Sequence, residues 1–176
     1  MLKVGLTGNI GSGKTMISKV FRILGIPVFY ADDIAKQIAE SNKNVINLYK
    51  DWFGSDIYIN GKLNRGKLAN IIFNNDELLQ LVNGLIHPLV LETFMNWIKN
   101  LESTPYVIFE SAILYNTLFA DVMDKIILIT APFELKIERV LKRDGRTVDE
   151  VKKILSKQPD EELIKKKADF IIINDE

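Results

Sequence analysis

The segment Gly8–Thr15 constrains the fold more than any other part of this sequence. It reads Gly-Asn-Ile-Gly-Ser-Gly-Lys-Thr and matches in full the Gly-x-x-x-x-Gly-Lys-Ser/Thr pattern of the P-loop. The apolar run Leu2–Thr7 precedes it and a helical pattern follows it, which is the strand–loop–helix context that the pattern requires. We therefore predict that this segment, called the P-loop below, binds the phosphates of a nucleotide.

Each residue type in the P-loop suits a particular contact with a nucleotide. Glycines adopt positive φ and turn backbone N–H groups inward around phosphate oxygens, and the following helix adds its positive N-terminal end. Lys14 supplies a charge for the β- and γ-phosphates, the Thr15 hydroxyl is placed to ligate Mg²⁺, and the Met16 N–H reaches the α-phosphate. The predicted nucleotide-binding residues of this segment are Gly8, Gly11, Ser12, Gly13, Lys14, Thr15 and Met16.

Five short apolar runs predict strands that are covered on both faces, because they lack a period-two alternation. They are Leu2–Thr7, Pro27–Tyr30, Tyr106–Phe109, Lys125–Ile129 and Phe170–Ile173. Helical patterns lie between them, so the predicted fold class is α/β, with a five-stranded parallel sheet flanked by helices. In the first helix, helical spacing predicts one buried stripe that consists of Met16, Val20, Ile23 and Leu24.

Two segments do not fit a simple alternation of one strand and one helix. Residues 33–104 are too long for one crossover and carry helical patterns with a predicted hairpin at Asn60-Gly61, which indicates a helical insert. Residues 133–167 are densely charged and helical, and they predict either a mobile lid or a solvated helix pair. The total of 176 residues fits a single domain that contains both segments.

Composition excludes several classes of function. The chain has 23 Lys and Arg against 23 Asp and Glu, so it lacks the basic surplus that general nucleic-acid binding needs. With no Cys and one His, disulfides, thiolate zinc sites, a cysteine nucleophile and multi-histidine metal centres are excluded. No apolar run approaches the roughly 18 residues of a membrane span, and Gly5 and Gly8 interrupt the N-terminus too early for a secretory signal. We therefore expect a cytoplasmic protein with a small-molecule partner.

Other motifs narrow the kind of P-loop protein. No Asn-Lys-x-Asp segment is present, which disfavours a GTPase, and the Asp-x-x-Gly at Asp51–Gly54 follows helical sequence and is interpreted as coincidence. Glu110 ends the third predicted strand, where it either holds Mg²⁺ through water, orients an acceptor or simply terminates the strand in solvent.

A small-molecule kinase also needs a base and cations for the transferred phosphoryl group. Asp32 and Asp33 follow the second strand, at the edge of a parallel sheet where ligands bind. Asp32 is the base candidate, and Asp33 is interpreted as a helix cap or first-turn acid. Lys136, Arg139 and Arg143 share one helical face, with Arg146 beyond, either to bind oxyanions or as an ordinary solvated face.

The whole set of motifs resembles the dephospho-CoA kinase family. The resemblance extends over nearly all of the chain and rests on segments outside the P-loop in a fixed order. They are Leu24-Gly25-Ile26-Pro27-Val28, Ala31-Asp32, Gly61–Arg65, Ile72-Phe73, Ile86-His87-Pro88-Leu89, Arg139–Asp144, Thr147, Gln158, and Ala168-Asp169 leading to Asn174. The His-Pro pair and the Arg-x-x-x-Arg-Asp…Gln…Ala-Asp series are specific to that family.

The resemblance implies an activity and assigns residue roles. The family transfers the ATP γ-phosphoryl group to the ribose 3′-hydroxyl of dephospho-CoA, which gives CoA in the final step of CoA biosynthesis. It implies that residues 33–104 bind the acceptor, with contacts from Arg65 and His87, and that 133–167 form a lid. The implied roles of the remaining residues are base (Asp32), lid arginines (Arg139 and Arg143), substrate contact (Glu110) and adenine contact (Asn174).

The chain departs from the family pattern at two positions where the family has an acidic residue, and it is also shorter than usual. Tyr30 stands where the family has the first Asp of Asp-Ala-Asp, and Asn116 stands where it has a Glu. The sequence stops at Glu176, about one helix short of the usual family length, so a further C-terminal helix is expected in a full-length member. Alternatives are another kinase of this fold, acting on a nucleoside monophosphate or a shikimate-like alcohol, or a non-catalytic ATP-dependent switch. The sequence does not specify an oligomeric state.

Overall fold

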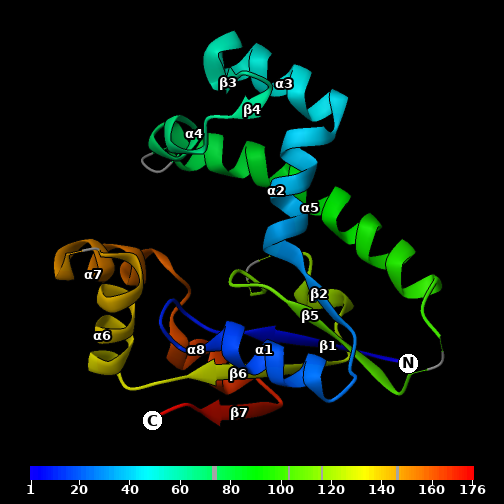
Figure 1. Cartoon of the computed structure of the whole chain (residues 1–176), viewed down its shortest axis with the longest axis vertical. Coiled ribbons are helices and arrows are strands. Elements are labelled where there is room, and N and C mark those ends of the chain that lie inside the picture. The colour runs from blue at the N-terminus through cyan, green and yellow to red at the C-terminus, as the bar shows by residue number, and fades with distance from the viewer. Residues whose placement is uncertain (73–74, 103, 116, 146) are drawn as a thin grey trace. The chain divides into compact units, whose positions relative to one another are not determined.

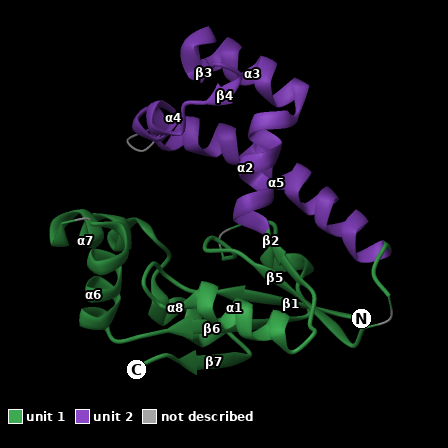
Figure 2. Cartoon of the chain, in the orientation of Figure 1, with its two compact units in different colours: residues 1–30, 100–176 green, residues 31–99 purple. Residues whose placement is uncertain are grey.

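The structure is a computed structural model that describes residues 1–176 except 73–74, 103, 116 and 146 (Figure 1). The chain forms two compact units, which are coloured separately in Figure 2. One, the sheet unit, consists of Met1–Tyr30 and Asn100–Glu176, and the other, the helical unit, consists of Ala31–Lys99.

The sheet unit is built on five parallel strands in the order β2-β5-β1-β6-β7. The strands are β1 (Leu2–Thr7), β2 (Val28–Tyr30), β5 (Tyr106–Glu110), β6 (Lys125–Thr130) and β7 (Phe170–Ile173). Because all five run parallel, their carboxyl ends share one edge of the sheet, and β1 continues from that edge into the P-loop. The predicted α/β class with a five-stranded parallel sheet is confirmed.

Side chains alternate between the two faces of β1. Val4 and Leu6 form a buried cluster with Ile108, Ile127 and Ile129 on the face that contacts the helix after the P-loop. Gly5 lies on the other face, where an added Cβ would be 3.1 Å from a side-chain carbon of Met123. The remaining elements of this unit are α1 (Lys14–Ile23), η2 (Ala120–Val122), α6 (Phe133–Asp144), α7 (Val148–Lys157) and α8 (Glu161–Lys167).

The predicted buried stripe on α1 is wrong. Ile17 and Phe21 pack against the sheet cluster and Ser18 is buried, whereas Met16 and Ile23 are 66% and 84% exposed. Val20 and Leu24 are exposed as well. Apolar spacing identified a helix, but α1 carries apolar residues on two faces, and the bulkier Phe21 face is the one that meets the sheet.

The helical unit contains four helices and one hairpin among its described residues. Its elements are α2 (Ala31–Ser41), α3 (Lys43–Phe53), η1 (Ser55–Ile57), β3 (Tyr58–Ile59), β4 (Lys62–Leu63), α4 (Arg65–Ile72) and α5 (Asp76–Lys99). The hairpin turns at Asn60 and Gly61, which both have positive φ as a tight two-residue turn requires, so the predicted hairpin is confirmed. Buried Val45, Tyr49 and Phe94 belong to its core.

Helix α5 is the long element of the helical unit. Within the described part of the chain, it is the one helix that is long and apolar enough to cross a membrane by length and composition. It contacts α2 and α4, and it contributes Val82, Ile86, Val90 and Phe94 to the buried residues of the helical unit. Its most apolar 18-residue window is 28% buried, so the expectation that no apolar stretch approaches a membrane span is wrong for this helix by length and composition.

Candidate active site

The P-loop has the backbone geometry that its glycines predict. Gly11 and Gly13 have φ of 80° and 89°, a region that L side chains rarely adopt. Space is also limiting, because a Cβ on Gly11 would lie 2.8 Å from Lys136 Cα and one on Gly13 would overlap the Asn174 amide nitrogen. Gly11 therefore requires glycine for two separate reasons, its φ and the Lys136 backbone, whereas at Gly13 the neighbour is the end of a side chain that can move and the φ is the deciding reason.

The P-loop leads directly into α1, whose N-cap is Gly13. The first backbone N–H groups of a helix have no partner four residues earlier, so those at the start of α1 can meet an anion. A pocket of about 440 Å³ opens here and is lined by Gly8–Met16 together with Ala112, Arg139, Val140, Arg143 and Gln158. All of the predicted P-loop ligands thus surround one pocket within the sheet unit.

Lys14 forms an ion pair with Glu110, 96 residues later in the chain. Glu110 ends β5, next to β1 in the sheet, with Leu6 as its register partner. The Lys14 and Glu110 side chains are 12% and 7% exposed, so a largely buried carboxylate balances the P-loop lysine. The interpretation of Glu110 as a solvated strand end is therefore wrong.

Arg139 and Asn174 lie against the outside of the P-loop. The Arg139 guanidinium donates to Gly11 O at 3.3 Å and to Asn174 Oδ1 at 3.2 Å, and it also donates to the backbone oxygen of Glu176. Asn174 Nδ2 in turn donates to Ser12 O at 3.0 Å. The two predicted site residues, from α6 and from the end of β7, therefore form one hydrogen-bonded group with the P-loop backbone.

Arg143 lines the same pocket but points to a different partner. Its guanidinium makes a bidentate pair with Asp144, at 2.7 and 2.9 Å, and hydrogen bonding to that carboxylate raises the Arg143 pKa. Lys136, also on α6, pairs with Glu161 of α8 instead, and its side chain is 6% exposed. Arg146, also considered from sequence, lies outside the described residues, as does Asn116.

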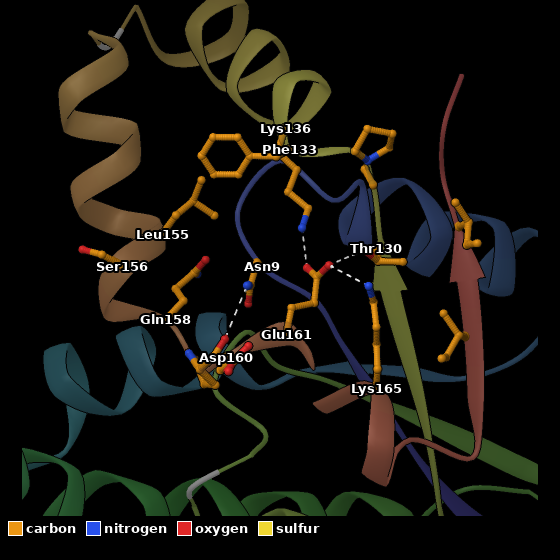
Figure 3. A pocket seen from close by; sticks show the side chains of 15 residues that line it. Asn9, Thr130, Phe133, Lys136, Leu155, Ser156, Gln158, Asp160, Glu161 and Lys165 are labelled. Carbon is orange, nitrogen blue, oxygen red and sulfur yellow. Dashed lines mark hydrogen bonds and ion pairs between the residues drawn. The ribbon is translucent and has the colours of Figure 1, made fainter. Parts of the chain in front are cut away.

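The segment after α7 makes contacts with the P-loop that sequence reasoning missed. Ile10 N donates to Gln158 Oε1 at 2.9 Å, and Asn9 Nδ2 donates to Pro159 O at 3.5 Å. Figure 3 shows Asn9 and Gln158 in the wall of a second pocket of about 830 Å³, beside Glu161. Gln158 was one of the residues that carried the family resemblance, but nothing in its spacing indicates which backbone group it meets.

The helical unit holds the other candidate residues. Its helix α2 begins at Ala31, directly after β2, so Asp32 and Asp33 are first-turn residues and the cap interpretation of Asp33 is wrong. Asp33 pairs with Lys36 at 2.7 Å, while Asp32 is partly buried. The two acids therefore have different surroundings within this unit.

Arg65 and His87 differ in exposure. Arg65 begins α4, is exposed, and pairs with Glu40 of α2 at 2.9 Å. His87 is buried in α5, and desolvation lowers its pKa, which favours the neutral imidazole. Among the residues that the structure describes, no group of three or more His, Cys, Asp or Glu is arranged to hold a metal ion.

Comparison with known proteins identifies the family of the chain. The family model described as dephospho-CoA kinase matches residues 2–176. The chain belongs to the dephospho-CoA kinase family. A dephospho-CoA kinase of Bacteroides fragilis (strain YCH46) is 37% identical over 175 residues, 99% of this chain and 85% of the relative.

Two solved structures are also similar. A Thermus thermophilus protein, TT1252, has a TM-score of 0.88 and 31% identity, over 98% of this chain and 88% of that one. The dephospho-CoA kinase from Campylobacter jejuni has a TM-score of 0.60 and 28% identity, over 98% and 87%. As a member of the dephospho-CoA kinase family, the chain is an ATP-dependent kinase of the final step of CoA biosynthesis.

Proposed function

We propose that the pocket around Gly8–Met16 holds the triphosphate of ATP while the γ-phosphoryl group moves to the ribose 3′-hydroxyl of dephospho-CoA. The observation that carries the proposal is the P-loop geometry, in which Gly11 and Gly13 shape a backbone nest that ends at Lys14 and the start of α1. Such a nest with a lysine and a helix N-terminus suits a polyphosphate better than any uncharged ligand.

The donor set also fits Mg²⁺, which prefers oxygen ligands and keeps several waters. The Thr15 hydroxyl is exposed in the first turn of α1, and the Glu110 carboxylate is held beside Lys14 at the end of β5. Thr15 would ligate the ion directly and Glu110 through water. When bound, the ion would supply positive charge that balances the phosphates during transfer.

The remaining residues act on the two reacting groups. The 3′-oxygen of the acceptor attacks the γ-phosphorus, the bond from that phosphorus to the β–γ bridging oxygen breaks, and ADP leaves. Asp32 accepts the proton of the 3′-hydroxyl, since it is an acid in the first turn of α2 and follows β2 by two residues in the chain. Arg139 and Arg143 balance charge on the transferred phosphoryl group. Asn174, which donates to Ser12 O, contacts the adenine of ATP.

Arg65 and His87 are proposed to contact the CoA portion of the acceptor. Arg65 offers an exposed guanidinium at the start of α4, which suits an acceptor phosphate. The neutral His87 offers one donor and one acceptor nitrogen. We also propose that the enzyme works in the cytoplasm on small molecules.

The direct test is incubation of the chain with ATP, Mg²⁺ and dephospho-CoA, followed by mass spectrometry of the products. We expect CoA and ADP in equal amounts. AMP and shikimate, offered in place of dephospho-CoA, should remain unphosphorylated. ADP formed without CoA, or transfer to AMP or shikimate, would contradict the proposal.

A further inference from the structure

Three consecutive P-loop residues are held by the segment that contains α6, α7 and α8. The Asn9 side chain donates a hydrogen bond from Nδ2 to Pro159 O, and the Ile10 N–H donates one to Gln158 Oε1. Gly11 O accepts one from Arg139. We call residues 9–11 the outer arm of the P-loop. These hydrogen bonds use the Asn9 side chain, the Ile10 N–H and the Gly11 carbonyl oxygen, so they leave the Gly11 N–H and the first turn of α1 for the expected phosphate contacts.

Gln158 is the central contact of the outer arm. Its Oε1 accepts the Ile10 N–H at 2.9 Å, and its side chain lines both the P-loop pocket and the larger pocket of Figure 3. A part-buried backbone amide needs an acceptor, and this glutamine supplies it across 148 residues of sequence.

The position of Gln158 is fixed from both sides. It is the C-cap of α7, and Asp160 two residues later is the N-cap of α8, whose carboxylate accepts from Glu162 N at 2.9 Å. Glu161 then joins α8 to the rest of the sheet unit, because it accepts from Thr130 of β6 and pairs with Lys136 of α6 (Figure 3). The turn that carries Gln158 Oε1 is therefore held in place by hydrogen bonds and an ion pair on its C-terminal side.

We propose that Gln158 is a positioning residue that sets the outer arm of the P-loop for nucleotide binding. The inference rests on the proposed phosphate-binding role of the P-loop. The Ile10 N–H belongs to the peptide unit between Asn9 and Ile10, one residue before Gly11, whose positive φ starts the nest. Without this acceptor, the unit rotates to find another partner, and the nest loses the arrangement in which its N–H groups converge.

The experiment compares Gln158→Met, which keeps the length of the side chain and removes the amide oxygen, with wild type and with Ser156→Ala. Ser156 lies two residues earlier on the same turn, and its hydroxyl donates to Lys153 O, away from the P-loop. Affinities for ADP and ATP are measured by calorimetry at a temperature at which circular dichroism shows all variants folded.

We expect Gln158→Met to weaken nucleotide binding about tenfold, which corresponds to about 1.4 kcal/mol. KM for ATP should rise by the same factor, while KM for dephospho-CoA should not change. Ser156→Ala should match wild type in all three values. A residue that only stabilised the fold would lower the melting temperature without this selective effect on ATP.

A second readout follows the hydrogen bond itself in the nucleotide-free protein. Amide exchange of Ile10, measured by NMR, should become faster in Gln158→Met and should stay slow in Gln158→Glu, whose carboxylate still accepts. Unchanged nucleotide affinity in Gln158→Met, or unchanged Ile10 exchange, would overturn the inference. If wild type itself bound no nucleotide, the proposed function would fail instead, so the two failures are distinguishable.

Discussion

The candidate residues of the sheet unit and those of the helical unit are held in different ways. Around the P-loop, side chains from α6, the turn after α7 and the end of β7 bond to backbone atoms. In the helical unit, Arg65 is exposed and makes an ion pair with another side chain, an interaction that contributes little rigidity. The proposed nucleotide site is therefore held by several hydrogen bonds to the backbone, whereas Arg65 of the proposed acceptor site can adjust to a ligand.

The largest expected effect is that of Asp32→Asn, which tests whether the helical unit takes part in the chemical step as well as in the proposed acceptor binding. Asp32→Asn should lower turnover with dephospho-CoA by about 10²- to 10⁴-fold, the usual contribution of a general base, and should leave ATP affinity and melting temperature unchanged. Asp33→Asn is the matched control and should change neither rate nor stability much, because Asp33 pairs only with exposed Lys36 among the contacts described.

Steady-state rates and thermal melts of the two variants settle the assignment. Near-normal turnover in Asp32→Asn together with a collapse in Asp33→Asn would place the base one residue later. Equal, small effects in both variants would mean that the helical unit supplies binding contacts alone.

The second prediction concerns Lys14 of the P-loop. Lys14→Ala should lower kcat/KM by about 10²- to 10³-fold, because one charge aimed at the transferring phosphates is lost. Its stability should fall as well, since Glu110 is left buried without its partner.

Two further variants separate these effects. Adding Glu110→Gln to Lys14→Ala should restore the melting temperature without restoring activity. Lys19→Ala, an exposed lysine on the same helix, should match wild type. A Lys14→Ala enzyme with normal rate and ATP affinity would contradict the phosphate assignment.

The third prediction distinguishes the two lid arginines. Arg143→Ala should lower kcat about 10- to 100-fold with little change in ATP affinity, because Arg143 contacts Asp144 and no P-loop atom among the hydrogen bonds described. Arg139→Ala should lower kcat and also raise KM for ATP, since it removes the donor to Gly11 O. Lys142→Ala is the control on the same helix, and identical kinetics for both arginine variants would refute the distinction.

The fourth prediction measures how tightly the P-loop is built. Gly11→Ala and Gly25→Ala both place a side chain at positive φ, which costs about 1–2 kcal/mol. Only at Gly11 does the new Cβ meet backbone, 2.8 Å from Lys136 Cα, because nothing lies within 4 Å of the one at Gly25. Gly11→Ala should therefore lose about 1–3 kcal/mol more in chemical denaturation. Equal losses of unfolding free energy in the two variants would show that the P-loop has as much space for a side chain as Gly25 at the end of α1.

The smallest effect is a pH dependence of the helical unit. Desolvation lowers the pKa of His87 in the folded chain, so the unfolded chain binds a proton more readily. The resulting stability is present above the unfolded-state pKa of about 6.5 and is lost as the pH falls below it. Melting temperatures from pH 7.5 to 5.0 should therefore fall more steeply in wild type than in His87→Gln. Parallel curves would exclude a buried, neutral His87.

The strands of the sheet unit were predictable because a parallel strand covered on both faces is apolar throughout. The observed β1 and β7 match the predicted runs residue for residue, and β2 differs by one residue. The P-loop was predictable for the same local reason, since its glycines, lysine and threonine lie within eight consecutive residues. In both cases the deciding information is contained in a short segment.

Contacts between distant residues were not predictable in this way. The Lys14–Glu110 pair joins two residues that were each proposed as site residues, yet their pairing depends on β1 and β5 being neighbours. The contact from Gln158 to Ile10 depends on how α7 ends and α8 begins. The buried face of α1 was wrong because apolar residues occupy two of its faces, and spacing alone does not distinguish them.

The ion pair between Lys14 and Glu110 has a consequence for which anions the pocket accepts. An arriving phosphate competes with a carboxylate that already neutralises the lysine from within a largely buried site. A singly charged anion that replaced this carboxylate would gain no net attraction, and it would leave Glu110 uncompensated. A polyphosphate brings several charges and spans the backbone nest as well. A ligand that recruits Lys14 therefore has to compensate for the loss of an ion pair that already exists inside the protein.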